Sequence, residues 1–262
     1  MMKRILLVFI LLIISITTFI VCSQQAEKTP VERGDRFADK FIDITEIADV
    51  RRLTELKRDF APFFSPSGDR IYFSRLIINS PADVDSHLVN NIENYFSIDY
   101  KNNQLYILLE IPAYPTISPL PPDSLPSLLM ESPGFGLRTS NAIYFSMHDN
   151  NNPYSRNVYK AIGDSITQIT YGSESSYLQV ISPNGRYIVF LYDQKHYGIV
   201  IYDSQTGNYY IVPKSNTESS RYDLMPMFSP DSKYMVFLRS GDLYNTAYIP
   251  FGDIWLVEFK ND

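Results

Sequence analysis

Phe228-Ser229-Pro230-Asp231-Ser232-Lys233-Tyr234-Met235-Val236-Phe237 has two close relatives earlier in the chain. They are Phe64-Ser65-Pro66-Ser67-Gly68-Asp69-Arg70-Ile71-Tyr72-Phe73 and Ile181-Ser182-Pro183-Asn184-Gly185-Arg186-Tyr187-Ile188-Val189-Phe190. In each copy, Pro suits the second position of a type I turn, and the Gly or Ser two residues later suits its exit. The β-branched and aromatic residues that follow are typical of a strand. A strand end, a tight turn and a second strand therefore recur three times, and such a repeat indicates the architecture.

A fourth, weaker copy is visible when the strands after the turns are aligned by their last Phe. Phe145 lies eight residues after Leu137, which then takes the place of the turn Ser. The four anchors, Ser65, Leu137, Ser182 and Ser229, are 72, 45 and 47 residues apart. A spacing of about 40–50 residues with short strands is typical of four-stranded propeller blades. The sequence therefore predicts an all-β protein, a β-propeller of about four four-stranded blades.

The last unit lacks an outer strand, because the chain ends shortly after Asp253–Phe259. The N-terminal stretches Ile42–Glu46 and Asp49–Thr54 resemble the outer strands of the other units. We therefore expect the N-terminal strand to complete the last blade, which closes the ring and removes exposed sheet edges. The propeller domain is expected to span residues 41–262.

The N-terminus reads as an export signal over residues 1–23. Lys3 and Arg4 precede an apolar run from Ile5 to Val21, and polar residues follow. The run is short for a spanning helix. Residues 24–40 are polar and are expected to form a tether.

Cys22 is the only cysteine of the chain and ends the apolar run. Its position resembles the lipidated cysteine of bacterial lipoproteins, although that family has Gly, Ala or Ser where this chain has Val21. Ordinary cleavage after Ser23 and an uncleaved signal anchor are the alternatives. In both cleaved forms the mature domain has no disulfide and no cysteine chemistry.

The first unit is longer than the others, and part of the excess is a Pro-rich insertion at 111–133 with seven prolines. This many prolines exclude a central strand and favour an extended surface loop. Long loops on a rigid scaffold commonly carry recognition. The candidate contacts of a binding face are Leu125, Leu128, Leu129 and Met130, which could instead cover a blade end.

The repeat Phe-Ser-Pro-x-Gly-(Lys/Arg)-x-Ile-x-Phe, followed in the third unit by Ile201–Gly207, resembles the WD40-like β-propeller repeat (PD40) of the TolB family. The resemblance covers about residues 41–262 and is strongest over 62–75 and 178–239. TolB proteins are periplasmic, combine a six-bladed propeller with a small α/β domain, and bind other envelope proteins. Only about four units fit this chain, so the resemblance implies a fold, a compartment and a binding rather than catalytic mode.

Catalysis is not expected. Gly163-Asp164-Ser165 spells the nucleophile block of GDSL esterases, and Asp193 and His196 have the spacing of the partner residues. That esterase fold needs alternating helices, for which the spacing leaves no room, and the hydrolase reading is a distant third. Of the three histidines, none stands at metal-ligand spacing from another His or Cys. We therefore expect neither cofactor nor metal.

The net charge of −6 and a pI near 5.1 argue against nucleic-acid binding. The expected function is that of an exported, non-enzymatic scaffold in the bacterial envelope, periplasmic or membrane-anchored as a lipoprotein. It would present its loops to an envelope protein of unknown identity. The alternative is the binding of a small ligand, glycan or peptide in the propeller channel.

Overall fold

The structure is a computed structural model, and it describes eight stretches of the chain. They are residues 37–75, 94–108, 136–149, 152–172, 174–193, 197–213, 222–240 and 251–260. The export signal, Cys22, most of the tether and the Pro-rich insertion lie outside them. Among the described residues, no helix is long and apolar enough to cross a membrane.

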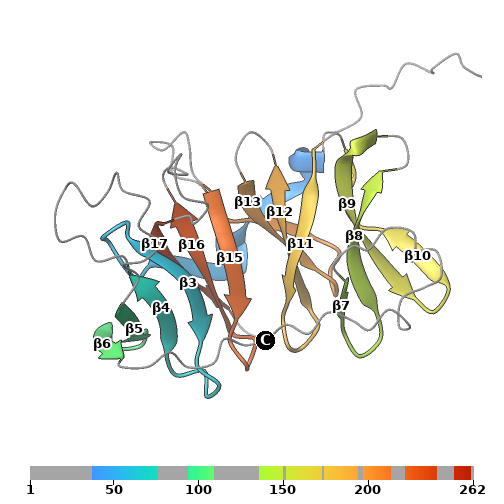
Figure 1. The fold of residues 1–262 in the computed structure, drawn as a ribbon. Helices are drawn as coiled ribbons and strands as arrows, with labels where there is room; N and C mark the ends of the chain where they lie inside the picture. The colour runs from blue at the N-terminus through green and yellow to red at the C-terminus, as the bar shows by residue number, and fades with distance from the viewer. Residues whose placement is uncertain are drawn as a thin grey trace, which may run out of the picture. The chain divides into compact units, whose positions relative to one another are not determined.

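Four antiparallel blades follow one another along the chain, and each is a run of adjacent strands (Figure 1). Blade 1 contains β3 (Asp59–Phe64), β4 (Ile71–Arg75), β5 (Asn94–Asp99) and β6 (Gln104–Leu108). Blade 2 contains β7 (Gly136–Arg138), β8 (Ile143–Asp149), β9 (Asn152–Ile162) and β10 (Ser165–Gln168). Blade 3 contains β11 (Ser176–Ile181), β12 (Tyr187–Asp193), β13 (Tyr197–Asp203) and β14 (Tyr209–Ile211). Blade 4 contains β15 (Tyr222–Phe228), β16 (Tyr234–Ser240) and β17 (Asp253–Phe259), and the all-β, four-bladed prediction is confirmed.

The missing strand of blade 4 comes from the N-terminal side of the domain, as predicted. Strand β2 (Ala48–Arg52) pairs antiparallel with β17, with Ala48 opposite Phe259 and Arg52 opposite Trp255. The edge that β17 would expose is thus covered by a strand about 200 residues away in sequence.

The repeated turn is held together by its serine. In blade 3, the Tyr187 N–H donates to Ser182 Oγ at 2.9 Å, and the Ser182 N–H donates to the Tyr187 carbonyl at the same distance. Ser65 and Ser229 make the same pair of bonds in blades 1 and 4. Gly185 takes a φ of +75°, a left-handed conformation that Gly adopts without strain. In three blades, therefore, the repeated serine forms two hydrogen bonds that close the turn between the first two strands.

Blade 2 reverses its chain in a shorter turn. Ile143 pairs with Arg138, whereas the equivalent Ile71 of blade 1 pairs with Phe64, so the turn of blade 2 has two residues fewer. Thr139 holds it, since its N–H donates to the Ala142 carbonyl at 2.8 Å. This shortening explains why the fourth copy of the motif lacks its Ser-Pro.

The blades pack in the order 1, 4, 3, 2. One buried apolar cluster joins blade 1 to blade 4, a second joins blade 4 to blade 3, and a third joins blade 3 to blade 2. The first cluster includes Phe73 and Leu256, the second Val189 and Phe237, and the third Tyr144 and Phe190. Within the described residues, no such cluster joins blade 1 to blade 2.

Residues 37–52, here called the strap, run from blade 2 to blade 4. The strap begins with the 3₁₀ helix η1 (Phe37–Lys40) and with β1 (Phe41–Asp43), which pairs parallel with β14 and adds a fifth strand to blade 3. The 3₁₀ helix η2 (Ile44–Glu46) and β2 follow. Phe37, the first residue that the structure describes, is buried and belongs to the same compact unit as the blades.

Candidate binding surface

The site residues proposed from the sequence are not brought together by the described part of the structure. Cys22 and the four loop residues Leu125, Leu128, Leu129 and Met130 lie outside the described residues. Ser165 starts β10 directly after the turn at Gly163 and is exposed. The surfaces that can be compared are therefore the face formed by the repeated turns, the opposite strand ends, and the outer sheet edges.

On the turn face, the blades touch one another through their repeated turns. A Cβ placed on Gly68 of blade 1 would lie 3.2 Å from Pro230 Cδ of blade 4. The Asn184 N–H of blade 3 donates to Ser232 Oγ of blade 4 at 3.0 Å. The turns of blades 1, 4 and 3 therefore contact one another in the same order as the buried clusters. Between blades 1 and 4 they leave little space for larger side chains.

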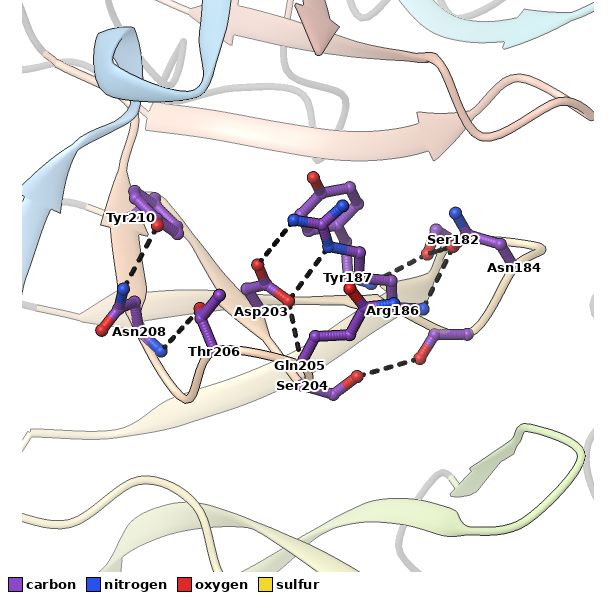
Figure 2. Close-up of polar contacts among 11 residues, drawn as sticks. Ser182, Asn184, Arg186, Tyr187, Asp203, Ser204, Gln205, Thr206, Asn208 and Tyr210 are labelled. Atoms are coloured by element: carbon purple, nitrogen blue, oxygen red, sulfur yellow. Dashed lines mark hydrogen bonds and ion pairs between the residues drawn. The ribbon is translucent and has the colours of Figure 1, made fainter. Parts of the chain in front are cut away.

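In blade 3, a polar network joins the two turns of this face (Figure 2). Arg186 donates twice to Asp203, from Nε at 3.2 Å and from Nη2 at 3.0 Å. Ser204 Oγ donates to the Gly185 carbonyl at 3.3 Å. The Gln205 N–H donates to Asp203 Oδ1 at 2.9 Å, which caps the second turn. The network thus ties the β11–β12 turn to the β13–β14 turn.

The electrostatics of this network match its geometry. Burial alone raises the pKa of Asp203, but the Arg186 hydrogen bonds and the Gln205 N–H outweigh it and hold the pKa below the ordinary value. The Asp203 hydrogen bond in turn raises the pKa of Arg186, whose guanidinium also lies 4.8 Å from the Tyr187 ring. The described polar groups of the network are directed at one another, which is the arrangement of a rigid structural element.

Two buried ion pairs stand at the opposite ends of the strands, at one shared position of the repeat. Arg75 Nε lies 2.5 Å from Asp59 Oδ1 in blade 1, and Arg239 Nε lies 2.6 Å from Asp223 Oδ1 in blade 4. In both blades the Asp stands six residues before the motif Ser and the Arg ten residues after it. Both carboxylates are fully buried and both pairs are bidentate.

Sequence reasoning missed these pairs, although a signal was present. Asp-x-x-Pro-x-Phe-Ser-Pro occurs as Asp59–Pro66 and again as Asp223–Pro230. The residue before the first Pro has a positive φ in both copies, +50° at Ala61 and +54° at Met225, where each inner strand bulges. The repeat is therefore longer than the turn motif from which it was identified.

Blade 3 has no ion pair at this position. Ser176 stands where blades 1 and 4 have Asp, and Tyr192 stands where they have Arg. Ser176 is 1% exposed, and its Oγ is one of three buried side-chain polar atoms in the described residues that have no hydrogen-bond partner. The small hydroxyl thus takes the place of a charged pair.

The four outer sheet edges differ in what they expose. The edge strand β2 carries Asp49, Arg51 and Arg52, and β10 is mostly polar. β6 carries no charge and exposes three large apolar or aromatic side chains. Their exposed fractions are 46% for Leu105, 37% for Tyr106 and 69% for Ile107. Exposed apolar edges are the ones most open to added strands, so β6 is the strongest candidate binding surface in the described part of the chain.

No cluster of three or more His, Cys, Asp or Glu side chains suited to a metal ion occurs among the described residues. The sequence matches no family model and no curated protein significantly. Solved structures do match. TolB from Acinetobacter baumannii is 12% identical over 74% of this chain and 41% of its own length, with a TM-score of 0.32. A protein of Agrobacterium tumefaciens described as a TolB is 14% identical over 82% of this chain and 99% of its own, with a TM-score of 0.36.

The C-terminal WD40 domain of Sif2 is 10% identical over 81% of this chain and 57% of its own length, with a TM-score of 0.34. This chain therefore spans less than half of the Acinetobacter TolB and most of the Agrobacterium protein. TM-scores of 0.36 and below carry no argument about function. The TolB and WD40 kinds that the repeat resembles are thus among the structural neighbours, and the four-bladed fold rests on the sheets and clusters described above.

Proposed function

We propose that this chain is a non-enzymatic binding protein of the bacterial envelope, in which a rigid propeller presents the outer edge of blade 1 to another protein. The observation that carries this proposal is the exposure of Leu105, Tyr106 and Ile107 on one uncharged edge strand. A binding site for a small ligand would instead be expected to be concave and to have converging polar groups. An exposed apolar edge favours a macromolecular partner.

The framework that presents this edge is stiff for identifiable reasons. The turn face is cross-linked between blades by Asn184 with Ser232, and within blade 3 by Arg186 with Asp203. The strap covers the outer edges of blades 3 and 4. A rigid scaffold loses little conformational entropy when it binds, so an exposed edge on it is a suitable contact surface.

The envelope location is part of the proposal and is supported by the N-terminal sequence. The basic and apolar residues before Cys22 support export, and Cys22 itself supports a lipid anchor. The absence of catalysis is also part of it. Ser165 lies at the start of an exposed edge strand, in the hairpin position that serves as a plain connecting turn in the other blades.

Site-specific photo-crosslinking in living cells tests the proposed function. A photoreactive amino acid is placed at Ile107 of the full chain, and at Thr167 on the exposed edge strand β10 as the matched control. A third position, Leu128, samples the Pro-rich insertion. We expect one reproducible crosslinked envelope protein from Ile107 and none from Thr167. Equal labelling at both positions, or no product from any position, would contradict the proposed function.

A further inference from the structure

Among the described strands, β6 is the last of its sheet and pairs on one side only. Tyr106 lies opposite Ser97 of β5, and Gln104 lies opposite Asp99. In an edge strand, alternate residues direct their N–H and C=O groups away from the sheet. Figure 1 shows β6 in green as the outermost strand of blade 1. Its outer side is therefore a row of backbone donors and acceptors that a further strand can pair with.

The side chains of β6 continue the buried face of blade 1. Leu105 lies in the row of Ile71 and Ile98, and Ile107 lies in the row of Phe73 and Phe96. The inner four members of these two rows are buried in the cluster shared with blade 4. Leu105 and Ile107 extend this face beyond that cover, so alternate side chains of an added strand would have apolar neighbours.

Among the described residues, three cations and two carboxylates lie near the turn end of β6. Arg70 lies 4.6 Å from the Tyr106 ring, and Lys101 is exposed in the β5–β6 turn. Arg51 donates to the Tyr100 carbonyl at the same turn. Among the described residues, no carboxylate forms an ion pair with any of these three cations.

The two carboxylates nearby accept hydrogen bonds from groups of their own turns. Asp99 accepts from the Lys101 and Asn102 N–H groups and from Asn102 Nδ2. Asp69 accepts from the hydroxyls of Ser65 and Ser67. Arg70 interacts electrostatically with both of these carboxylates, whereas Lys101 and Arg51 form no ion pair among the described residues. An acidic group on an incoming strand would therefore meet Lys101 and Arg51 at the turn end of β6.

The same molecule already contains a strand added to a blade edge. In blade 3, β1 pairs with the outer strand β14 from Phe41 opposite Tyr209 to Asp43 opposite Ile211. β1 is short and apolar at its start, and it has an Asp at its end and another at position 39. The outer edge of a blade in this fold therefore accepts a fifth, acidic and apolar strand.

We propose that β6 is the docking site for an extended segment of the partner protein, which adds to blade 1 as a fifth strand with apolar side chains and a flanking acidic residue. This inference rests on the proposed function and names the chemistry of its partner. A second copy of this chain fits less well as the occupant. Pairing β6 with itself would bring two sets of Arg70 and Lys101 together and would cover far less than the roughly 1,200 Å² of a stable interface.

The test uses the purified exported domain and a labelled synthetic peptide, acetyl-Asp-Val-Thr-Val-Thr-Val-Asp-amide, with a peptide that has Lys at both ends as control. Binding is measured by fluorescence anisotropy, and hydrogen exchange of the backbone amides locates the bound peptide. We expect protection of amides in residues 104–108, and binding at least about tenfold weaker for the Lys peptide. Added salt should reduce the difference between the two peptides.

Proline substitutions in β6 distinguish a loss of peptide binding from a loss of folding. Neighbouring residues of a strand direct their N–H groups to opposite sides, so one of Tyr106→Pro and Ile107→Pro removes an outward N–H and the other an inward one. We expect the outward variant to keep the thermal midpoint of the parent and to lose peptide binding about tenfold or more. Thr167→Pro on β10 is the matched control and should leave peptide binding unchanged.

The outcomes distinguish the two proposals. If the acidic peptide does not bind at millimolar concentration, or protects amides elsewhere, while Ile107 still crosslinks to one envelope protein, strand addition is wrong and the proposed function stands. If self-association through β6 is found by sedimentation and blocks the peptide, a second copy is the occupant and the proposal is overturned. If Ile107 captures nothing as well, both proposals fail.

Discussion

Blades 1 and 4 are joined in a different way from blades 2 and 3. Beside the 1–4 junction, each of the two blades contains an ion pair of its own: Asp59 with Arg75 in blade 1, and the buried Asp253 with the partly exposed Arg52 in blade 4. Two backbone hydrogen bonds cross the junction, because Asp59 and Gly252 each donate their N–H to the carbonyl of the other residue. The 1–4 junction is therefore held by interactions whose geometry is strict.

The 2–3 junction is held by aromatic packing and by small neutral polar groups. Phe37 of the strap is 3% exposed, and its ring centroid lies 4.9 Å from that of Tyr171 in blade 2 and 5.0 Å from that of Tyr209 in blade 3. Six buried Ser, Thr and Asn side chains lie in the neighbouring strands and connection. They are Ser146, Ser155, Asn157, Thr170, Ser175 and Ser176.

This difference shows that one repeat can close its blade junctions with two chemistries. A buried ion pair needs its exact partner, because removal of one charge leaves the other unpaired at low dielectric. Aromatic packing tolerates more variation but depends on the volume that fills the space. The ways to break the two junctions are therefore different.

The largest effect is expected from breaking the buried ion pair of blade 1, which lies beside the 1–4 junction. Arg75→Met leaves the fully buried Asp59 carboxylate without its partner, and we expect a loss of about 3–5 kcal/mol in the free energy of unfolding. Chemical denaturation measures it. The double variant Asp59→Leu/Arg75→Met removes both charges and should recover most of the loss. A double variant as unstable as the single one would mean that packing, not charge, holds this junction.

The next effect is expected at the 2–3 junction from Phe37→Ala. Removal of a buried aromatic ring leaves a cavity among Phe41, Tyr171 and Tyr209, and we expect a loss of about 3 kcal/mol. Hydrogen exchange should show faster exchange at β1. Ile42→Ala on the same strap is the control, because Ile42 is 37% exposed and its loss should change stability by less than about 1 kcal/mol. Equal effects of both variants would show that the strap is not anchored by Phe37.

A smaller effect on stability is expected from two serines of blade 3, Ser182 in the β11–β12 turn and Ser176 in β11, and it should differ between them. Ser182 Oγ accepts the Tyr187 N–H, so Ser182→Ala leaves a buried donor unsatisfied and should cost about 1–3 kcal/mol. Ser176 Oγ has no partner, so Ser176→Ala should be neutral or stabilising by up to about 1 kcal/mol. Thermal unfolding of the two variants compares them directly. A destabilising Ser176→Ala would indicate a bound water or an ion at the position where blades 1 and 4 have Asp.

The smallest effects are expected from pH, with opposite signs at two aspartates. The pKa of Asp203 is lowered despite its burial, because Arg186 and the Gln205 N–H stabilise the charged form. Its contribution is therefore present above the ordinary pKa and is lost as the pH falls through the lowered one. Burial raises the pKa of Asp253 in spite of Arg52, so its contribution is present at low pH and is lost as the pH rises through the raised value.

Unfolding of Asp203→Asn and Asp253→Asn at pH 7 and at about pH 3 checks these signs. Asp203→Asn should be less stable than the parent at pH 7, and the difference should become smaller as the pH falls toward 3. Asp253→Asn should gain stability relative to the parent as the pH rises over the same range. The same sign for both variants would contradict the assignment of the Asp203 network as stabilising.

Much of the fold could be predicted because the turn chemistry is local. The turn serine, which accepts the N–H of the first residue of the next strand, and the left-handed residue after it lie within about six residues, as at Ser182 and Gly185. The completion of blade 4 by β2 was also predictable, since a three-stranded last unit leaves an edge that needs a partner. The extra strand β1 was not, because nothing in Phe41–Asp43 specifies a parallel partner in blade 3.

By itself, the sequence determined the repeat, a propeller of about four blades and many of its strands, since turn preferences and alternating apolar residues depend on close neighbours. Only the tertiary structure decided which residues far apart meet. Asp59 and Arg75 become a buried pair, and Phe37 enters the space between blades 2 and 3. Among the described strands, β6 remains the outer edge of blade 1. The physical reason is that burial and pairing at these positions depend on the packing of neighbouring blades, which no local pattern encodes.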